Sequence, residues 1–205
     1  DFVNSYPTAS KEVVIPAIPN QLPKAGQKAS ASHTLRILTP GDVNTTFTLE
    51  VLSADGKFIP VGMSSRSIEA GVVSEFSFEP KISASAFAVR VTSAEPIVAS
   101  VSSSVTISRH KDFVWSTATP PLTPMSIAVT GLSPLIAFAG ESISVKVQAK
   151  LVNGKTVSAS VAGSDIATWR APANARSITI LSSSKGVFAG ALIASTNGYG
   201  FIPIV

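Results

Sequence analysis

The sequence lacks cysteine altogether and contains only two methionines in 205 residues. A chain without cysteine cannot be stabilised by disulfides, which are common in secreted animal domains of this size. Many exported proteins of Gram-positive bacteria have none, so the absence favours a bacterial source. The chain begins at Asp1, with neither an initiator methionine nor a signal sequence, and we therefore expect a processed or truncated ectodomain.

Charged residues are also scarce. They make up 14% of the chain, against about 25% in an average soluble protein, whereas 45% of the residues are hydrophobic. A composition this apolar argues against disorder. The apolar runs, such as residues 126–129 and 201–205, are far shorter than the roughly 20 residues that span a bilayer. No segment is therefore predicted to cross a membrane, and membrane association would depend on a segment outside this chain.

The formal net charge is +4 and the isoelectric point is near 9.5. The basic residues are nevertheless dispersed, and they never form the dense cluster typical of a nucleic-acid interface. We therefore expect no nucleic acid among the partners. The positive charge supports only a mild attraction to polyanions, such as phosphate-bearing wall polymers or anionic lipid head groups.

The clearest structural signal lies between residues 46 and 60. Phe47, Leu49 and Val51 alternate with polar residues, which is the period of two that a half-buried strand requires. Asp55-Gly56 is then predicted to supply the positive φ angles of a two-residue hairpin turn before a returning strand.

The same pattern returns over residues 144–158, with Asn153-Gly154 at the turn. Further along the chain, residues 87–93 align with residues 177–183, and residues 96–101 align with residues 186–191. These correspondences predict that one structural unit occurs twice.

The predicted strands of both units are short and are separated by turn residues. They cover residues 34–38, 45–53, 57–61, 72–78, 87–93, 97–107 and 113–116 in the first unit, and residues 126–130, 142–151, 156–160, 166–169, 177–181, 187–194 and 200–204 in the second. Seven short strands per unit without a helix are typical of a sandwich. The predicted fold is all-β, with two tandem immunoglobulin-like β-sandwich domains.

Proline marks the predicted boundaries. The divisions are an irregular lead-in over residues 1–30, the first sandwich over residues 31–119, a Pro-rich linker over residues 120–124 and the second sandwich over residues 125–205. Three prolines in the linker favour a stiff, extended connection. One strand is expected in the lead-in, over residues 12–15. Because residues 1–3 repeat the Asp-Phe-Val of residues 112–114, an alternative interpretation makes the lead-in the last strand of an upstream domain.

Four segments of the first unit resemble a known family. They are residues 35–41 (LRILTPG), 54–56 (ADG), 86–101 (AFAVRVTSAEPIVASV) and 112–115 (DFVW). On these segments the chain is similar to a family of exported actinobacterial proteins known as domain of unknown function 5719, over most of residues 34–122 and more loosely in the second unit. The resemblance implies a location in the cell envelope. It carries no catalytic residues, since none are established for the family.

No catalytic or metal-binding arrangement is found in the sequence. His33 and His110 would need a further ligand such as Asp112 to hold a metal ion, and the plainer interpretation is two exposed loop histidines. The Gly-x-Ser-x-Gly motif of serine hydrolases does not occur. The acidic residues are scattered, without a pair suited to a glycosidase or a loop suited to calcium. We therefore expect no catalytic residues, no metal site and no cofactor.

The aromatic residues allow two interpretations. Trp115, Trp169 and Tyr199 all lie in or beside predicted strands, where packing in the core or at an edge is the usual role. Sugar-binding modules, in contrast, stack pyranose rings on exposed Trp or Tyr. If such a ligand-binding platform exists, we predict that Trp169, Arg170 and Tyr199 form it, with Tyr199 on a strand next to that of Trp169.

Two functional hypotheses follow. The first is a non-enzymatic extracellular or cell-surface module that acts as a spacer, a scaffold or a protein-binding domain, with another envelope protein as partner. The alternative is a module that binds a carbohydrate or cell-wall polymer and accompanies an upstream catalytic domain. Both leave function to loops and outer faces, because the apolar residues of a sandwich fill its core.

Overall fold

The computed structural model describes residues 8–20, 32–107, 110–194 and 198–205. Within these ranges the chain is all-β, which confirms the predicted class, and no helix in them could cross a membrane. The strands are β1 (Ser10–Pro19), β2 (Ser32–Leu38), β3 (Thr45–Ser53), β4 (Gly56–Phe58), β5 (Arg66–Ile68), β6 (Ser74–Phe78), β7 (Ala86–Ile107), β8 (His110–Thr117), β9 (Met125–Ala128), β10 (Leu135–Leu151), β11 (Thr156–Arg170), β12 (Ala175–Ser183), β13 (Phe188–Ala194) and β14 (Tyr199–Ile204).

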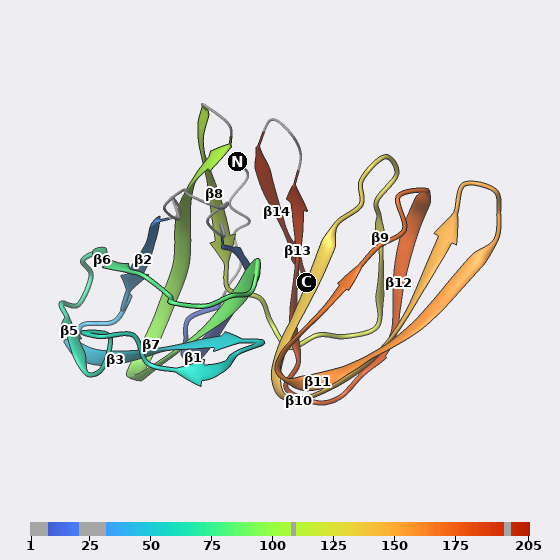
Figure 1. Cartoon of the computed structure of the whole chain (residues 1–205). Coiled ribbons are helices and arrows are strands. Elements are labelled where there is room, and N and C mark those ends of the chain that lie inside the picture. Colours follow the sequence, from blue (N-terminus) through green and yellow to red (C-terminus); the bar gives the residue numbers. More distant parts are fainter. Residues whose placement is uncertain (1–7, 21–31, 108–109, 195–197) are drawn as a thin grey trace.

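The strands form two curled sheets that lie side by side (Figure 1). The 8-stranded sheet has the order β4-β3-β7-β2-β6, with β1 and β8 also paired to β7 and β5 paired to β3. The 6-stranded sheet has the order β14-β13-β10-β12-β9, with β11 also paired to β10. Each sheet folds around its own hydrophobic core.

The two sheets share one pattern of antiparallel pairing. In the first, the N-terminal half of β7 pairs with β1 and β3, and its C-terminal half pairs with β2 and β8. In the second, β12 pairs with β9 and the C-terminal half of β10, while β13 pairs with β14 and the N-terminal half of β10. The two halves of β11 take the places of β4 and β6. The sequence alignment of residues 87–93 with 177–183 agrees with this correspondence between β7 and β12.

The two sheets differ in which of their strands are continuous: a single strand in one sheet corresponds to two shorter strands in the other. Strands were expected over residues 87–93 and 97–107 with a turn at Ala94-Glu95-Pro96, but β7 is one strand. Residues 94–96 lie where β7 passes from one set of partners to the next, so Pro96 removes no ladder hydrogen bond. Likewise, the two strands expected between residues 156 and 169 are one strand, β11. It bends at Asp165, whose φ is 62°, opposite a register shift in β10.

The prediction of an irregular lead-in is wrong for residues 10–19. They form β1, which pairs with β7 of the 8-stranded sheet and extends well beyond the expected residues 12–15. Ile15 and Ile18 enter the first core, whereas Val14 and Ala17 face the other sheet. A strand buried on both faces has a continuous apolar sequence rather than an alternating one. The proposed repeat at residues 1–3 lies outside the described residues.

The hairpin between β3 and β4 is displaced by one residue from the prediction. Ser53 pairs with Gly56, so Ala54 and Asp55 occupy the turn. Gly56 has a φ of 114°, whereas Asp55 is not among the described residues with positive φ. The Asp55 carboxylate instead accepts hydrogen bonds from the Ser83 hydroxyl (2.7 Å) and backbone N–H (2.6 Å), and these bonds hold its pKa below the ordinary value.

Replacing Gly56 with valine tests this turn. We expect Gly56→Val to lower the free energy of unfolding by about 1 kcal/mol or more, because a residue with a Cβ rarely adopts positive φ. Gly41→Val is the matched control, since Gly41 has an ordinary φ and, like Gly56, open space where a Cβ would lie. Equal urea midpoints for the two variants would contradict the assignment.

Three hydrophobic clusters stabilise the chain. The first core surrounds Phe47 and Phe87 inside the 8-stranded sheet, and the second surrounds Phe138 and Ile178 inside the 6-stranded sheet. Each fully buried side chain of this size contributes about 2 kcal/mol. A third group, the junction cluster, joins the sheets. Its buried members are Val14, Ala17, Leu52, Ala86, Ala88, Ala137, Ala139, Ile166 and Leu192, with Leu135, Phe188, Tyr199 and Phe201 packed against them.

The Pro-rich segment between the sheets is tied to both of them. The Thr119 N–H donates to the Val14 carbonyl (3.1 Å) on the first sheet. The Leu122 N–H donates to the Val187 carbonyl (2.6 Å), and the Leu122 carbonyl accepts a hydrogen bond from Ser183 (3.0 Å) on the second. The Leu122 side chain belongs to the second core. These contacts fix the path of the segment against the molecule.

Candidate functional site

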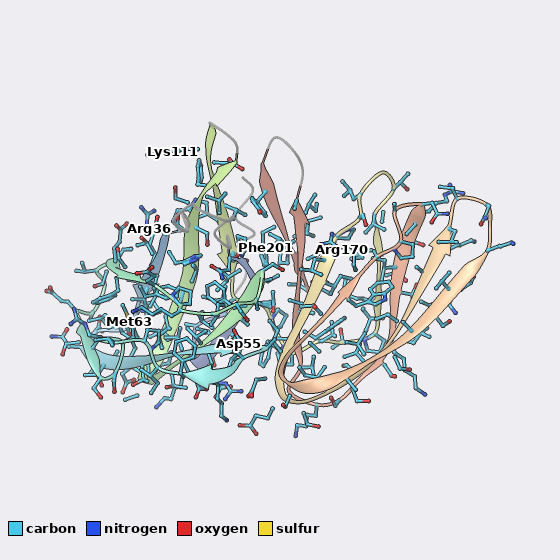
Figure 2. The ribbon with its side chains drawn as sticks, viewed as in Figure 1. Arg36, Asp55, Met63, Lys111, Arg170 and Phe201 are labelled. Carbon is cyan, nitrogen blue, oxygen red and sulfur yellow. The ribbon has the colours of Figure 1, made fainter. Side chains whose placement is uncertain are left out.

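The structure does not bring the predicted platform residues together. Trp169 pairs with Ile136 on β10 and packs against the second core. Tyr199, at the start of β14, packs against the junction cluster on the opposite face of the sheet. Strands β10 and β13 lie between β11 and β14, so these strands are not neighbours as predicted. Exposed Arg170 donates from Nη1 to the Ser133 carbonyl (3.1 Å) and lies at the edge of the second sheet (Figure 2).

The interpretation of His33 as an exposed loop residue is wrong. His33 lies on β2 with 1% of its surface exposed, between the rings of Phe78 and Phe87 at 5.6 and 5.0 Å. Its Nδ1 lies 2.9 Å from the Ser103 hydroxyl, and burial lowers its pKa to about 4. The His110 side chain lies outside what the structure describes. In the described part of the chain, no group of three His, Asp or Glu could hold a metal ion.

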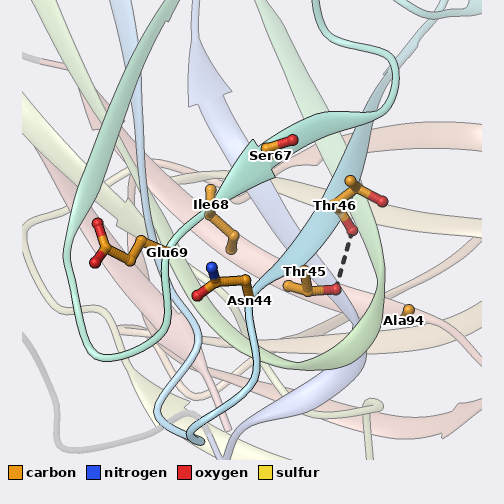
Figure 3. Close-up of a pocket in the computed structure, with 7 residues that line it drawn as sticks. All are labelled: Asn44, Thr45, Thr46, Ser67, Ile68, Glu69 and Ala94. Atoms are coloured by element: carbon orange, nitrogen blue, oxygen red, sulfur yellow. Dashed lines mark hydrogen bonds between the residues drawn. The ribbon is translucent and has the colours of Figure 1, made fainter.

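A hollow of about 570 Å³, lined mostly by residues with polar side chains, opens beside β3 and β5 (Figure 3). Its lining residues are Asn44, Thr45, Thr46, Ser67, Ile68, Glu69 and Ala94. Two of their polar side chains already have partners: Oδ1 of the Asn44 side chain accepts from the Ala70 N–H (2.9 Å), and the Thr45 hydroxyl lies 3.1 Å from that of Ser93. Glu69 is the one titratable residue of the described lining, so the hollow lacks the paired groups that acid–base chemistry requires.

The strongest candidate for a binding surface is the outer face of β2, β7 and β8. Residues directly opposite each other in antiparallel strands lie on the same face. The register therefore places Thr34, Ser102 and Trp115 in one row and Arg36, Ser100 and Thr117 in the next. A third row contains Ser104 and Phe113. We call the surface formed by Thr34, Arg36, Ser100, Ser102, Ser104, Phe113 and Trp115 the aromatic face.

Arg36 and Trp115 meet across the small side chains of β7. The Arg36 guanidinium carbon lies 4.7 Å from the centre of the Trp115 ring, a cation–π contact. Arg36 Nε also lies 2.5 Å from the Glu75 carboxylate, so the charge of the arginine is balanced. Beside this pair is an apolar hollow of about 400 Å³, lined also by Leu38, Val73 and Val98. Figure 2 shows Arg36 on the first sheet, on the far side from Arg170.

Sequence reasoning missed this surface although part of its signal was present. Phe113 and Trp115 alternate along one strand, and Ser100, Ser102 and Ser104 alternate along another. A period of two places each set on a single face. The sequence did not show that β8 pairs with this half of β7, which is what brings the two sets together.

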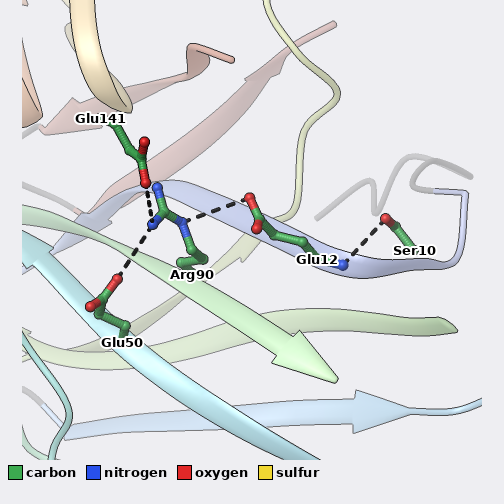
Figure 4. A network of polar contacts seen from close by, with 5 residues as sticks. All are labelled: Ser10, Glu12, Glu50, Arg90 and Glu141. Atoms are coloured by element: carbon green, nitrogen blue, oxygen red, sulfur yellow. Dashed lines mark hydrogen bonds and ion pairs between the residues drawn. The ribbon is translucent and has the colours of Figure 1, made fainter. Parts of the chain in front are cut away.

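A charged network joins the sheets at one side of the junction cluster (Figure 4). Arg90 on β7 lies within 3.5 to 3.7 Å of carboxylate oxygens of Glu12 on β1, Glu50 on β3 and Glu141 on β10. The Arg90 side chain is 14% exposed, whereas that of Glu141 is 78% exposed. One guanidinium therefore forms ion pairs with three strands, one of them in the other sheet, although its Nε has no hydrogen-bond partner among the described residues.

Comparison with known proteins gives one family and no function. The model of a family described as "Family of unknown function (DUF5719)" matches residues 1–169. No curated protein matches the chain. Among solved structures, "Crystal Structure of Thermotoga maritima 1070" is similar at 16% identity, with a TM-score of 0.33, and the match covers 54% of this chain and 93% of that one. A similarity this low carries no argument about the fold.

Proposed function

This chain belongs to the family of unknown function DUF5719, and because the family supplies no function, we propose one from the geometry of the chain. The protein is a non-enzymatic module of the cell envelope that acts as a spacer or scaffold. The location outside the cell is part of the proposal, and the lack of cysteine in an apolar β-rich chain is compatible with it. Another envelope protein is the partner that such a scaffold would hold.

The observation that carries the proposal is the junction between the two sheets. β1 is buried on both faces, with Ile15 in the first core and Val14 and Ala17 against the second sheet. Five of the nine buried members of the junction cluster are alanines, and small side chains allow the sheets to approach closely. A scaffold must keep its ends in a fixed relation, and a packed junction of this kind resists bending.

The charged network supports the same role. Glu141 on the second sheet lies 3.7 Å from Arg90, which also contacts Glu12 and Glu50 on the first. A partly buried guanidinium shared among three carboxylates favours one relative orientation of the strands that carry them. Because the Glu141 side chain is 78% exposed, its ion pair across the sheets contributes little to stability.

For the fold class we propose the immunoglobulin-like sandwich of the sequence analysis for each unit. The support is the pairing pattern, in which two antiparallel groups of strands enclose a core in both sheets. The units differ from an ordinary sandwich in one respect. A sandwich has two separate sheets, whereas in each unit a long strand, β7 or β10, continues from one group of strands into the other, so that a single sheet curls around the core.

Spin-label distances test the scaffold. The chain has no native cysteine, so Thr46→Cys on β3 with Lys146→Cys on β10 places one label on an exposed strand residue of each sheet. We expect a single narrow distance distribution, because a packed junction allows little relative motion. Each single-cysteine variant is the control for intermolecular signals. A broad or two-peaked distance distribution would show that the two sheets move relative to each other and would contradict the proposed role as a spacer or scaffold.

A second candidate function, binding of a carbohydrate or cell-wall polymer, is supported by the aromatic face. This surface differs from the one that the sequence suggested at Trp169, Arg170 and Tyr199. This second proposal includes an upstream catalytic domain, which the binding module would accompany.

A further inference from the structure

The aromatic face combines two features that serve one class of ligand. Phe113 is 56% exposed, Trp115 is half-buried, and both project from the same side of β8, about 7 Å apart along the strand. Beside them the outward side chains of β7 are serines. We propose that this face binds a neutral polysaccharide, with Phe113 and Trp115 contacting sugar rings and Ser100, Ser102 and Ser104 bonding to hydroxyl groups.

The serine hydroxyls of the face are available for a ligand. Ser100, Ser102 and Ser104 are partly exposed, and within the described ranges none of their hydroxyls has a hydrogen-bond partner in the protein. Some serines elsewhere are engaged within the protein: the hydroxyl of Ser53 donates to the Gly56 carbonyl, and that of Ser184 donates to the Ser142 carbonyl. A hydroxyl both donates and accepts, which matches the hydroxyl groups of a sugar.

The rings supply the apolar part of the recognition. The flat face of a pyranose carries C–H groups that pack against an aromatic ring, while its edge carries the hydroxyls. Trp115 also lines the apolar hollow, together with Val98 and Leu38. Ligand sites of this type have an apolar lining with a few polar groups that fix orientation.

Charge decides between a neutral and an anionic polymer. Arg36 is already paired with Glu75 at 2.5 Å and stacked on Trp115, so it offers no unbalanced positive charge. Lys111, farther along β8, is exposed and, among the described side chains of that strand, is the one other cation on this side. A site for a phosphate-bearing polymer needs several basic side chains, which the described residues of this face do not supply.

A protein partner fits the surface less well. The core of a protein interface is apolar and continuous, whereas the rows of the aromatic face alternate rings with small hydroxyl side chains. The inference rests on the second candidate function and not on the scaffold. The spin-label experiment can therefore contradict the scaffold without affecting the polysaccharide inference, and the binding experiment can contradict the inference without affecting the scaffold.

Co-sedimentation with actinobacterial cell-wall sacculi tests the inference. The sacculi are boiled in detergent and digested with protease, which removes protein partners, and one portion is treated with hydrofluoric acid to remove phosphate polymers. We expect the protein to sediment with both portions, and the binding to persist as salt is raised, because neutral contacts are not screened.

The variants assign the binding to the face. Trp115→Ala and Ser102→Val should each weaken binding to the sacculi at least five-fold. Both substitutions alter side chains of the aromatic face. Trp169→Phe, which changes the other tryptophan, is the matched control and should bind like the original protein. Melting curves check that each variant is folded.

Three results would overturn the inference. Absence of sedimentation with either portion rejects a wall glycan as the ligand. Binding that disappears with the phosphate polymers, or simply as salt rises, indicates attraction of a basic protein to polyanions. Binding that survives in folded Trp115→Ala and Ser102→Val places the contact elsewhere on the molecule.

Discussion

The protein will lose roughly 3 kcal/mol of its unfolding free energy as the pH falls from 6.5 to about 4, and His33→Gln will lose much less. His33 is almost fully buried between two phenylalanines, and its Nε2 has no hydrogen-bond partner in the described part of the chain. Burial without a compensating charge favours the neutral ring. The pKa is therefore lowered in the folded state, from the ordinary 6.5 to about 4.

The sign follows from which state binds the proton first. Below pH 6.5 the unfolded chain protonates His33, whereas the folded chain does so only near pH 4. Stability from this residue is complete above pH 6.5, falls between the two values and levels off below the lower one. Asp55, the other described group with a lowered pKa, titrates below its ordinary 3.8 and so acts outside this window.

Urea unfolding at several pH values between 7 and 4 measures the effect. Glutamine has a similar volume to histidine, cannot titrate, and can keep a hydrogen bond to the Ser103 hydroxyl, which lies 2.9 Å from the ring. The variant thus separates protonation from packing. Parallel pH dependences for the two proteins over this range would show that His33 does not titrate as the structure implies.

Gly190→Ala will destabilise the chain by about 2 kcal/mol, because the added methyl group overpacks the junction. A Cβ at this position would lie 2.7 Å from Cε2 of Phe201, 3.1 Å from Cγ of Pro16 and 3.2 Å from Cβ of Ala17. Phe201 lies on the neighbouring strand β14, whereas Pro16 and Ala17 belong to β1 of the other sheet, so the added methyl group would collide both within its own sheet and with the other sheet. Figure 2 shows Phe201 in the region where the sheets meet.

Gly200→Ala is the control for this substitution. Gly200 lies in the neighbouring strand of the same sheet, and a Cβ there would approach only Ile193, at 4.0 Å. Chemical unfolding should therefore separate two glycines that differ in their surroundings and not in their kind of secondary structure. In the doubly spin-labelled protein, Gly190→Ala should also broaden the distance distribution. Equal stability of the two variants would mean that the sheets do not approach as closely as described.

The alternation of side chains predicted most of the strands, because burial of one face leaves a period of two in the sequence. The prediction failed for strands that are not buried on one face only. β1 is buried on both faces, and its apolar run lacks the alternation. Pro96 indicated a turn, but β7 continues through it because the ladder partners change at that point.

The site could be predicted only in part for a related reason. Trp169 and Tyr199 were paired because both are aromatic and near strand ends, yet the order of strands in a sheet is set by long-range packing that neighbouring residues do not encode. Their faces turned out to be opposite. Phe113 and Trp115 show the same limit, since their alternation and that of the β7 serines were both visible, whereas the pairing of β8 with that half of β7 was not.

The position of β1 also has a consequence for how the chain folds. β1 comes early in the sequence, but its partners β7 and β13 come much later. Contacts between distant segments form slowly, since the intervening chain must first be ordered. During synthesis, the apolar residues from Val13 to Ile18 therefore stay unprotected until most of the chain has emerged. A chaperone that holds this segment would keep it from aggregating over that interval.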